Sequence, residues 1–346
     1  MAGRLWRARS FHLYLRLMLL TLCALTPVSA QQHQKIVPKR PLTHRDYDRW
    51  RSIQGPQLSP DGRFLAYLLA PQDGDGEIVV RQLATGIEWR SGRGWCRPSA
   101  ADPSQANSLA QIFITRDSRF AIFVIEPNKE DLTRPRGERR TVAEAPKTGL
   151  GIMDLSNGRV TRIDRVRSFQ LPANGSGYLA YSLEPRPEDA GTDKRTESSP
   201  LILYHLANHT QRAFGNVLEY SLSQDARSLV FTVSSRTGET NGVYVITPGS
   251  DQAPAALLAG AGRYRGLTWD AGQTQLAFLS DRDEAGSERP RYKLYHWDRQ
   301  APRAAAIVSV ETPGFRRGLM ISDQAPLSFS SDGSRLFLGV SPPLKT

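Results

Sequence analysis

The stretch Leu58-Ser-Pro-Asp-Gly-Arg-Phe-Leu-Ala-Tyr67 decides the fold, because it joins a tight turn to a strand that is apolar on both faces. Pro60 presets the first turn angle, Asp61 can bond its own backbone, and Gly62 accepts the left-handed conformation of a bulged hairpin. From Phe64 to Leu69, apolar residues occupy both alternating positions. A sheet with one wet face would alternate with polar residues, so we expect this strand to be covered on both sides.

The same phrase occurs six times along the chain, and this repetition is the strongest signal in the sequence. The copies run over Leu58–Tyr67, Ile114–Phe123, Leu171–Tyr181, Leu222–Phe231, Leu267–Phe278 and Phe329–Leu338. Their turn residues are Asp61, Asp117, Asn174, Asp225, Asp270 and Asp332, separated by 56, 57, 51, 45 and 62 positions. Intervals of this size are typical of propeller blades.

A second strand signal follows most copies, as at Glu77–Leu83 and Gly242–Ile246. The period is turn, buried strand, loop and half-exposed strand, which gives a four-stranded meander per repeat once less legible strands are counted. The sequence therefore predicts an all-β fold, a β-propeller of about six to eight four-stranded blades, with an incomplete propeller left open. A β-sandwich is the alternative, but it does not explain a turn that recurs with its flanking strand at near-constant intervals.

Residues 1–30 have the order of a secretory signal peptide. Four arginines accompany the apolar run Leu17–Leu25, and Val28-Ser-Ala30 places small residues at the cleavage site. The run is too short for a membrane-spanning helix, so we expect a periplasmic or secreted protein with no integral membrane segment after cleavage. A retained anchor is the alternative.

Residues 31–55 form the predicted lead-in segment, and residues 56–346 the predicted propeller. Thr43 and Asp46 resemble a capping box that starts a short helix, with an aromatic and aliphatic stripe up to Ile53. Gly55-Pro56 would end this helix.

The charge and cysteine content argue against two classes of protein, nucleic-acid-binding proteins and domains held by internal disulfides. Removal of the leader and its four arginines lowers the formal net charge from +11 to +7, and the densest basic cluster, Arg134–Arg140, lies in a Pro/Gly-containing stretch. A nucleic-acid interface would need a basic stripe with interleaved aromatic residues, and none is visible, so no nucleic-acid partner is expected. Only Cys96 remains in the mature chain, so it forms no internal disulfide.

Four stretches resemble the N-terminal propeller of exported peptidases of the prolyl oligopeptidase family, which includes dipeptidyl-peptidases and acylaminoacyl-peptidases. They are Tyr47–Ile53, Leu58–Tyr67, Pro71–Arg81 and Leu327–Pro343. The Ser-Pro-Asp-Gly element among them is shared with other propellers, such as the periplasmic propeller protein of the Tol system. The resemblance implies a propeller that gates and orients peptide substrates over a C-terminal α/β-hydrolase domain with a Ser-Asp-His triad.

The sequence lacks the catalytic features of this family. It contains no Gly-x-Ser-x-Gly and no alternating strand and helix pattern of a hydrolase sheet, so no catalytic, cofactor-binding or metal-binding residue is assigned and no cofactor is expected. Two interpretations stay open: a non-catalytic portion of a longer serine peptidase, or a free-standing periplasmic propeller that scaffolds protein partners. A propeller enzyme with a site at the channel mouth is a third.

Several residues are candidates for metal, calcium or glycosylation sites, but each has a simpler structural explanation. His44, His205, His209 and His296 do not have metal-ligand spacing, and Asp73, Asp75 and Glu77 form no complete calcium loop. Asn174-Gly-Ser176 and Asn208-His-Thr210 match the glycosylation triplet but fall at predicted hairpin turns. Trp95, beside Cys96 in a predicted loop, is the aromatic residue most suited to a ligand contact.

Overall fold

The computed structural model describes residues 41, 43–47, 50–96, 111–133, 146–184, 199–287 and 290–343. The chain divides into two compact units, Met1–His44 and Arg45–Thr346, and all strands of the described residues lie in the second. The predicted signal peptide, residues 1–30, and the basic cluster from Arg134 lie outside the described residues.

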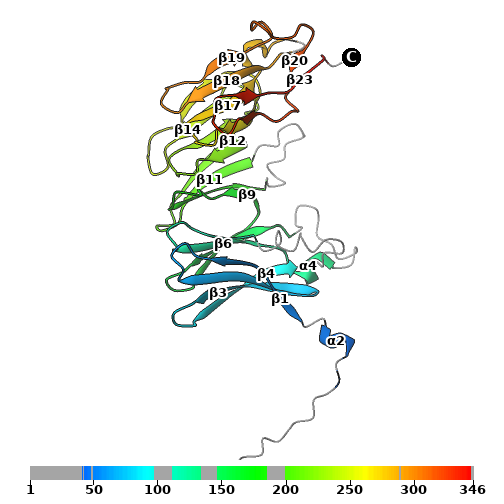
Figure 1. The fold of residues 1–346 in the computed structure, drawn as a ribbon, viewed down its shortest axis with the longest axis vertical. Coiled ribbons are helices and arrows are strands. Elements are labelled where there is room, and N and C mark those ends of the chain that lie inside the picture. Colours follow the sequence, from blue (N-terminus) through cyan, green and yellow to red (C-terminus); the bar gives the residue numbers. More distant parts are fainter. Residues whose placement is uncertain are drawn as a thin grey trace, which may run out of the picture. The chain divides into compact units, whose positions relative to one another are not determined.

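The second unit is built of antiparallel sheets in which neighbouring strands follow one another in sequence, except that β20 pairs with β23 (Figure 1). The first sheet contains β1 (Arg51–Leu58), β2 (Phe64–Pro71), β3 (Gly74–Gln82) and β4 (Glu88–Cys96). The second contains β5 (Ile112–Ile114), β6 (Phe120–Ile125), β7 (Gly149–Asp154) and β8 (Val160–Ile163). The fifth contains β16 (Tyr264–Trp269), β17 (Gln275–Ser280), β18 (Lys293–Asp298) and β19 (Ala305–Val308).

The third and fourth sheets share one long strand, β12 (Gln211–Leu222). Residues 211–217 pair with β11 and residues 217–222 pair with β13, so β12 ends one sheet and begins the next. The third sheet adds β9 (Val166–Gln170), β10 (Tyr178–Leu183) and β11 (Ser199–His205). The fourth adds β13 (Leu229–Val233), β14 (Gly242–Ile246) and β15 (Ala255–Ala259).

The last part of the second unit contains two small two-stranded sheets, called here together the sixth sheet. β20 (Met320–Ile321) pairs with β23 (Val340–Ser341), and β21 (Ser328–Phe329) pairs with β22 (Leu336–Phe337). By their order along the chain, β20 and β21 take the place of the first strand of this sheet, and β22 and β23 take the place of the second. Helices are short: α2 (His44–Tyr47), α4 (Lys129–Thr133) and the 3-10 turn η3 (Arg282–Glu284).

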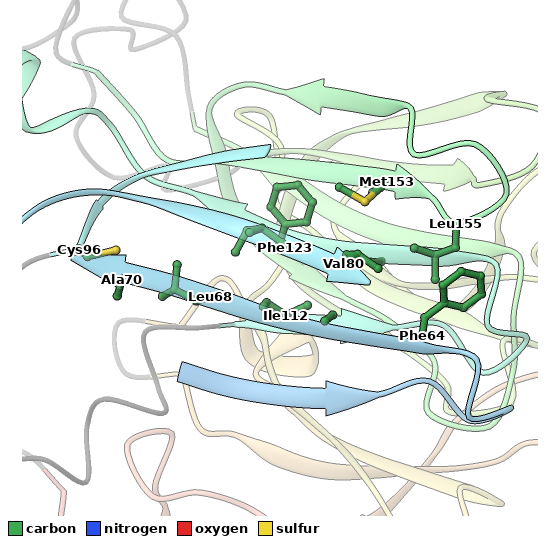
Figure 2. Close-up of a cluster of buried hydrophobic side chains, with 12 residues drawn as sticks. Phe64, Leu68, Ala70, Val80, Cys96, Ile112, Phe123, Met153 and Leu155 are labelled. Carbon is green, nitrogen blue, oxygen red and sulfur yellow. The ribbon is translucent and has the colours of Figure 1, made fainter. Parts of the chain in front are cut away.

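The hydrophobic core consists of five clusters, each made by two successive sheets. In the first cluster, Leu68 and Val80 of the first sheet meet Ile112 and Phe123 of the second, and Figure 2 shows these side chains. In the second to fifth sheets the second strands are buried on both faces over most of their length, as the sequence predicts; β6 has five buried residues in succession, whereas β2 alternates buried with half-buried residues. The all-β class and the four-stranded antiparallel sheets are therefore confirmed.

The predicted lead-in helix is not supported, because the described residues of this segment contain only the single helical turn of α2. Helix α2 ends at Tyr47, and β1 begins at Arg51, inside the segment predicted to be helical. Ile53 pairs with Leu69 of β2, and its side chain is 61% exposed. Pairing with an already buried strand satisfies the backbone of residues 51–58, which a single isolated helical turn could not do as well.

Candidate functional site

Each repeated phrase forms the turn between the first and second strands of its sheet, called here the first-hairpin turn. In the first sheet, the Ser59 hydroxyl donates to Asp61 Oδ1 at 2.6 Å and accepts from the Phe64 N–H at 2.9 Å. Asp61 Oδ1 also accepts from the Arg63 N–H at 3.0 Å, and Gly62 has φ +73°. The same pattern of bonds joins Thr115 to Asp117, Ser223 to Asp225 and Ser330 to Asp332.

In the first and last of these turns the bonds favour the ionised carboxylate of Asp61 and of Asp332. The hydrogen bond from Ser59, followed by that from the Arg63 backbone, holds the pKa of Asp61 well below its usual range. Hydrogen bonds from Ser330 and Ser334 lower the pKa of Asp332 to about 2. Each turn hydroxyl donates to a carboxylate and accepts a backbone N–H, so it is committed to the turn rather than free to act as a nucleophile.

Two of the six turns differ from the predicted alignment. Asp270 occupies the place of Ser59, not of Asp61, because its N–H bonds Gln275 O and its Oδ1 accepts from the Thr274 and Gln275 N–H groups. The Asp270 carboxylate therefore accepts the backbone hydrogen bonds that a hydroxyl and a separate aspartate accept in the other turns. Asn174 bonds outside its own turn: its N–H and that of Gly175 both donate to Gln224 O at 2.8 Å.

The first-hairpin turns of several successive sheets bond to one another. The Asp61 N–H donates to Ser118 Oγ at 3.2 Å, and the Gln224 N–H donates to Gln273 Oε1 at 2.5 Å. Gln275 Nε2 donates to Gly333 O at 2.8 Å. With the bond from Asn174 to Gln224, these contacts place the turns of neighbouring sheets side by side and present them as one surface.

Arg299, from the turn after β18, fastens the fourth and fifth sheets together. Its guanidinium bonds Asp225 at 2.9 and 3.0 Å and donates to Ser228 Oγ, while its carbon lies 5.7 Å from the ring centre of Trp269. Burial raises the pKa of Asp225, but the bonds from Arg299 and Ser223 outweigh it and hold that pKa well below the usual range. Nothing in the sequence marks Arg299, because its partners lie on another repeat.

An open cavity of about 470 Å³ lies between the β11–β12 hairpin and the β14–β15 loop. Its floor includes Tyr178 and His205, whose rings meet edge to face with centroids 4.9 Å apart. Arg212 donates to Ser250 O at 2.8 Å and so holds the opposite loop. Gly249 has φ +85°, and a Cβ there would come within 2.7 Å of the Tyr178 hydroxyl.

The chemistry of this cavity suits binding rather than hydrolysis. The Asn208 N–H donates to His205 Nδ1 at 3.3 Å, which places the imidazole proton on Nε2. The Thr210 hydroxyl donates to Asn208 Oδ1 at 2.8 Å, so it has no general base. The cavity thus offers an imidazole N–H, a phenol and the Asp251 carboxylate to a small polar group.

The structure separates the remaining candidate histidines. His44 lies in α2. His209 Nδ1 lies 2.6 Å from the Tyr204 hydroxyl, and His296 Nε2 lies 2.7 Å from Gln275 Oε1. In the part of the chain that the structure describes, no three His, Cys, Asp or Glu residues come together to hold a metal ion.

The acidic residues near position 75 bind neighbouring side chains. Asp73 accepts from Lys129 Nζ and from Trp95 Nε1, and Asp75 accepts from the Lys129 N–H at 2.8 Å. Glu77 pairs with Arg51 and with an arginine of β4. These contacts are structural ones, and those of Lys129 join the first sheet to α4.

Trp95 and Cys96 lie in β4 rather than in the predicted loop, because Gly74 pairs with Cys96 and Asp75 with Trp95. Burial raises the pKa of the Cys96 thiol. Both glycosylation triplets lie at turns as expected: Asn208 Oδ1 bonds Thr210, and the Asn174 amide bonds Gln224. Among the described residues, no helix has the length and apolar character that a membrane crossing requires.

The sequence matches no protein-family model, and no curated protein matches it. Solved structures are similar in fold. The β-propeller domain of the trilobed protease from Pyrococcus furiosus is 12% identical with a TM-score of 0.38, and the match covers 87% of this chain and 85% of that one. A prolyl endopeptidase structure is 16% identical with a TM-score of 0.41, over 84% of this chain and 39% of that one.

An acylaminoacyl peptidase from Pyrococcus horikoshii is 12% identical with a TM-score of 0.36, over 82% of this chain and 44% of that one. The chain thus spans less than half the length of these two peptidases. A likeness at this level concerns the fold and assigns no activity to the chain. The structural neighbours of this chain include β-propeller domains of prolyl endopeptidase and acylaminoacyl peptidase family members.

Proposed function

We propose that this chain is the propeller portion of an exported serine peptidase, non-catalytic in itself, that gates peptide substrates. The observation that carries the proposal is where the resembling stretches fall. Leu58–Tyr67 and the middle of Leu327–Pro343 form the first hairpins of the first and sixth sheets. The stretches that resemble the peptidase family therefore occupy equivalent places in successive units of one repeating β fold.

We expect the first strand of each sheet and the first-hairpin turns to restrict which peptides pass. The first strands carry exposed apolar side chains: Ile53 is 61% exposed and Leu58 59% in β1, Phe113 is 42% exposed in β5, and Leu218 is 39% exposed in β12. Such residues can contact the apolar side chains of an extended peptide, while the bonded turns keep the strands in place. A rigid frame of this kind limits the size of the peptide that passes it.

The proposal is tested on the polypeptide from its native source. An antibody raised against residues 50–343 identifies the native polypeptide, and a fluorophosphonate probe labels active serine hydrolases. We expect the antibody to detect a chain much longer than 346 residues that the probe labels, with labelling lost after pretreatment with a peptidyl chloromethyl ketone. The recombinant chain of residues 31–346 serves as the control and should stay unlabelled.

A native polypeptide that carries no label, at any length, would contradict the peptidase proposal. A free-standing chain of the length given, recovered with a stable protein partner, would instead support the scaffold function. Peptide cleavage by the recombinant chain alone would contradict both, because its turn hydroxyls are committed to structural bonds.

A further inference from the structure

One position in the second strand of each sheet, called here the sealing position, faces the next sheet. It is the seventh residue after the start of the first-hairpin turn, and in the first five sheets it is fully buried: Ala66, Ile122, Ala180, Val230 and Ala277 are each 0% exposed. Backbone hydrogen bonds establish this equivalence. In four sheets the N–H of the first turn residue donates to the carbonyl oxygen five residues later, which belongs to Phe64, Phe120, Ser228 or Gln275. In the third sheet the Leu206 N–H donates to Gly177 O as the Leu83 N–H donates to Arg63 O, so Gly177 is equivalent to Arg63.

Each sealing residue shares a hydrophobic cluster with a residue on the first strand of the following sheet. The partners share its cluster and are nearly buried; they are Ile112, Val166, Val217, Tyr264 and Ile321. At five successive interfaces, therefore, the sealing residue is buried in the cluster that the two sheets form together. Side chains alternate between faces in a strand, so the sealing position always points toward the next sheet.

In the sixth sheet the sealing position is Phe337, and its side chain is 55% exposed. The Ser330 N–H bonds Arg335 O as the Ser59 N–H bonds Phe64 O, so Phe337 is the match of Ala66. Its neighbours in sequence, Leu336 and Leu338, turn the other way and pack into the fifth cluster. A phenylalanine at the place where five repeats are sealed marks a sixth interface of the same kind.

The edge of the sixth sheet is open in the same place. In the first five sheets the second strand pairs on both sides, as β2 does with β1 and β3. Among the described residues, β22 pairs only with β21, and β23 only with β20. Val340 on this edge is 47% exposed. An apolar strand with one free edge is a template for a further strand.

We infer that the Phe337 face and the free edge of β22 and β23 are covered by further antiparallel strands of the same repeat, supplied by polypeptide that follows Pro343. Chain order favours this occupant. In each of the first five sheets the third strand comes next along the chain after the second, as β3 follows β2 and β18 follows β17. By the same order, the third strand of the sixth sheet comes after β23.

The chemistry of the covering segment follows from the five interfaces. Its first strand in contact with the edge should be an apolar third strand like Ile78-Val79-Val80, which is fully buried. The next sheet should place an aliphatic or aromatic residue in one cluster with Phe337, as Ile112 shares a cluster with Ala66. The inference shares with the proposed function only the expectation of a longer polypeptide, not of a peptidase domain.

Hydrogen exchange measured by mass spectrometry tests the inference on two proteins, the polypeptide isolated from its native source and the recombinant chain of residues 31–346. We expect the segment from Arg335 to Ser341 to exchange at least about 100-fold more slowly in the native polypeptide than in the recombinant chain. The β17 segment, paired on both sides in either protein, is the matched control and should exchange equally.

Substitution gives a second measurement. Phe337→Lys should lower the urea midpoint of the native-length polypeptide and leave that of the recombinant chain unchanged, whereas Leu83→Lys, at a leucine 46% exposed, should change neither. Equal exchange of residues 335–341 in both proteins overturns the inference. So does protection in the recombinant chain that rises with concentration, since a second copy would then cover the face. A longer, protected polypeptide that no fluorophosphonate labels would leave the inference standing and contradict the peptidase function.

Discussion

Removal of Arg299 should weaken the joint between the fourth and fifth sheets. A hydrogen bond to a charged partner contributes about 1.5–3 kcal/mol net, and here two bonds reach one carboxylate at 2.9 and 3.0 Å. The Arg299 side chain is 17% exposed but that of Asp225 is 39% exposed, so solvent screens part of the interaction. We expect Arg299→Ala to lower the free energy of unfolding by about 2 kcal/mol and Arg299→Lys, which lacks the planar fork, by about 1 kcal/mol.

The measurement is urea unfolding of residues 31–346 at pH 7, followed by tryptophan fluorescence, since Trp269 lies beneath the guanidinium. Arg51→Ala is the matched control: the Arg51–Glu77 pair is 51% and 38% exposed, and its loss should cost less than about 0.5 kcal/mol.

The effect should also depend on pH. Because the pKa of Asp225 is lowered in the folded chain, the stability it contributes is complete above its unfolded pKa of 3.8 and is lost as the pH falls through the folded pKa. The difference between Arg299→Ala and the parent should therefore shrink below about pH 4. Equal costs for Arg299→Ala and Arg51→Ala, or a difference that grows in acid, would refute this reasoning.

Two further substitutions probe the packing and the joints. A Cβ at Gly151 would lie 2.3 Å from the Phe123 ring, so Gly151→Ala should destabilise the chain by about 1–3 kcal/mol in urea unfolding. Gly215→Ala is the control: a Cβ there meets nothing within 4 Å, so this change should be neutral or slightly stabilising. The reverse order of stabilities would contradict the register of β6 and β7. Glu219 accepts from the Gly266 and Leu267 N–H groups at 2.9 and 3.2 Å, so Glu219→Ala should cost about 1–3 kcal/mol and Glu219→Gln distinctly less, and equal costs would show that these bonds do not join the fourth and fifth sheets.

Local signals predict the repeating part of the fold well. The Ser-x-Asp turns and the apolar runs that follow them depend on contacts within about ten residues, so Ser59, Thr115, Ser223 and Ser330 can be read from the sequence. The fifth turn was misaligned by the same reasoning, because an aspartate can replace the hydroxyl as the acceptor of the same backbone groups.

Residues that join the sheets could not be read from the sequence. Arg299 binds Asp225, 74 positions away, and Gln275 binds Gly333, 58 positions away. The lead-in helix is predicted from the helical spacing of Tyr47, Trp50 and Ile53, whereas the pairing of Arg51–Leu58 with β2 depends on a partner that local periodicity does not contain. The cavity beside His205 likewise needs a loop from the next sheet.

The repeated turns lie at one end of successive sheets, where hydrogen bonds join the first turn to the second and link the third, fourth, fifth and sixth in succession. A double substitution, Asn174→Cys with Gln224→Cys, tests this arrangement directly. The Asn174 N–H lies 2.8 Å from Gln224 O, and backbone groups in such contact have Cα atoms about 5 Å apart, within the range of about 4.4–6.8 Å that a disulfide spans.

Under mild oxidation we expect this pair to form a disulfide in the folded chain of residues 31–346, detected as a linked peptide by mass spectrometry, while the native Cys96, which is buried, stays reduced. Asn174→Cys with Asp332→Cys, which joins turns of sheets that are not neighbours, should form none. Linkage of the second pair in place of the first would contradict the arrangement of sheets described here.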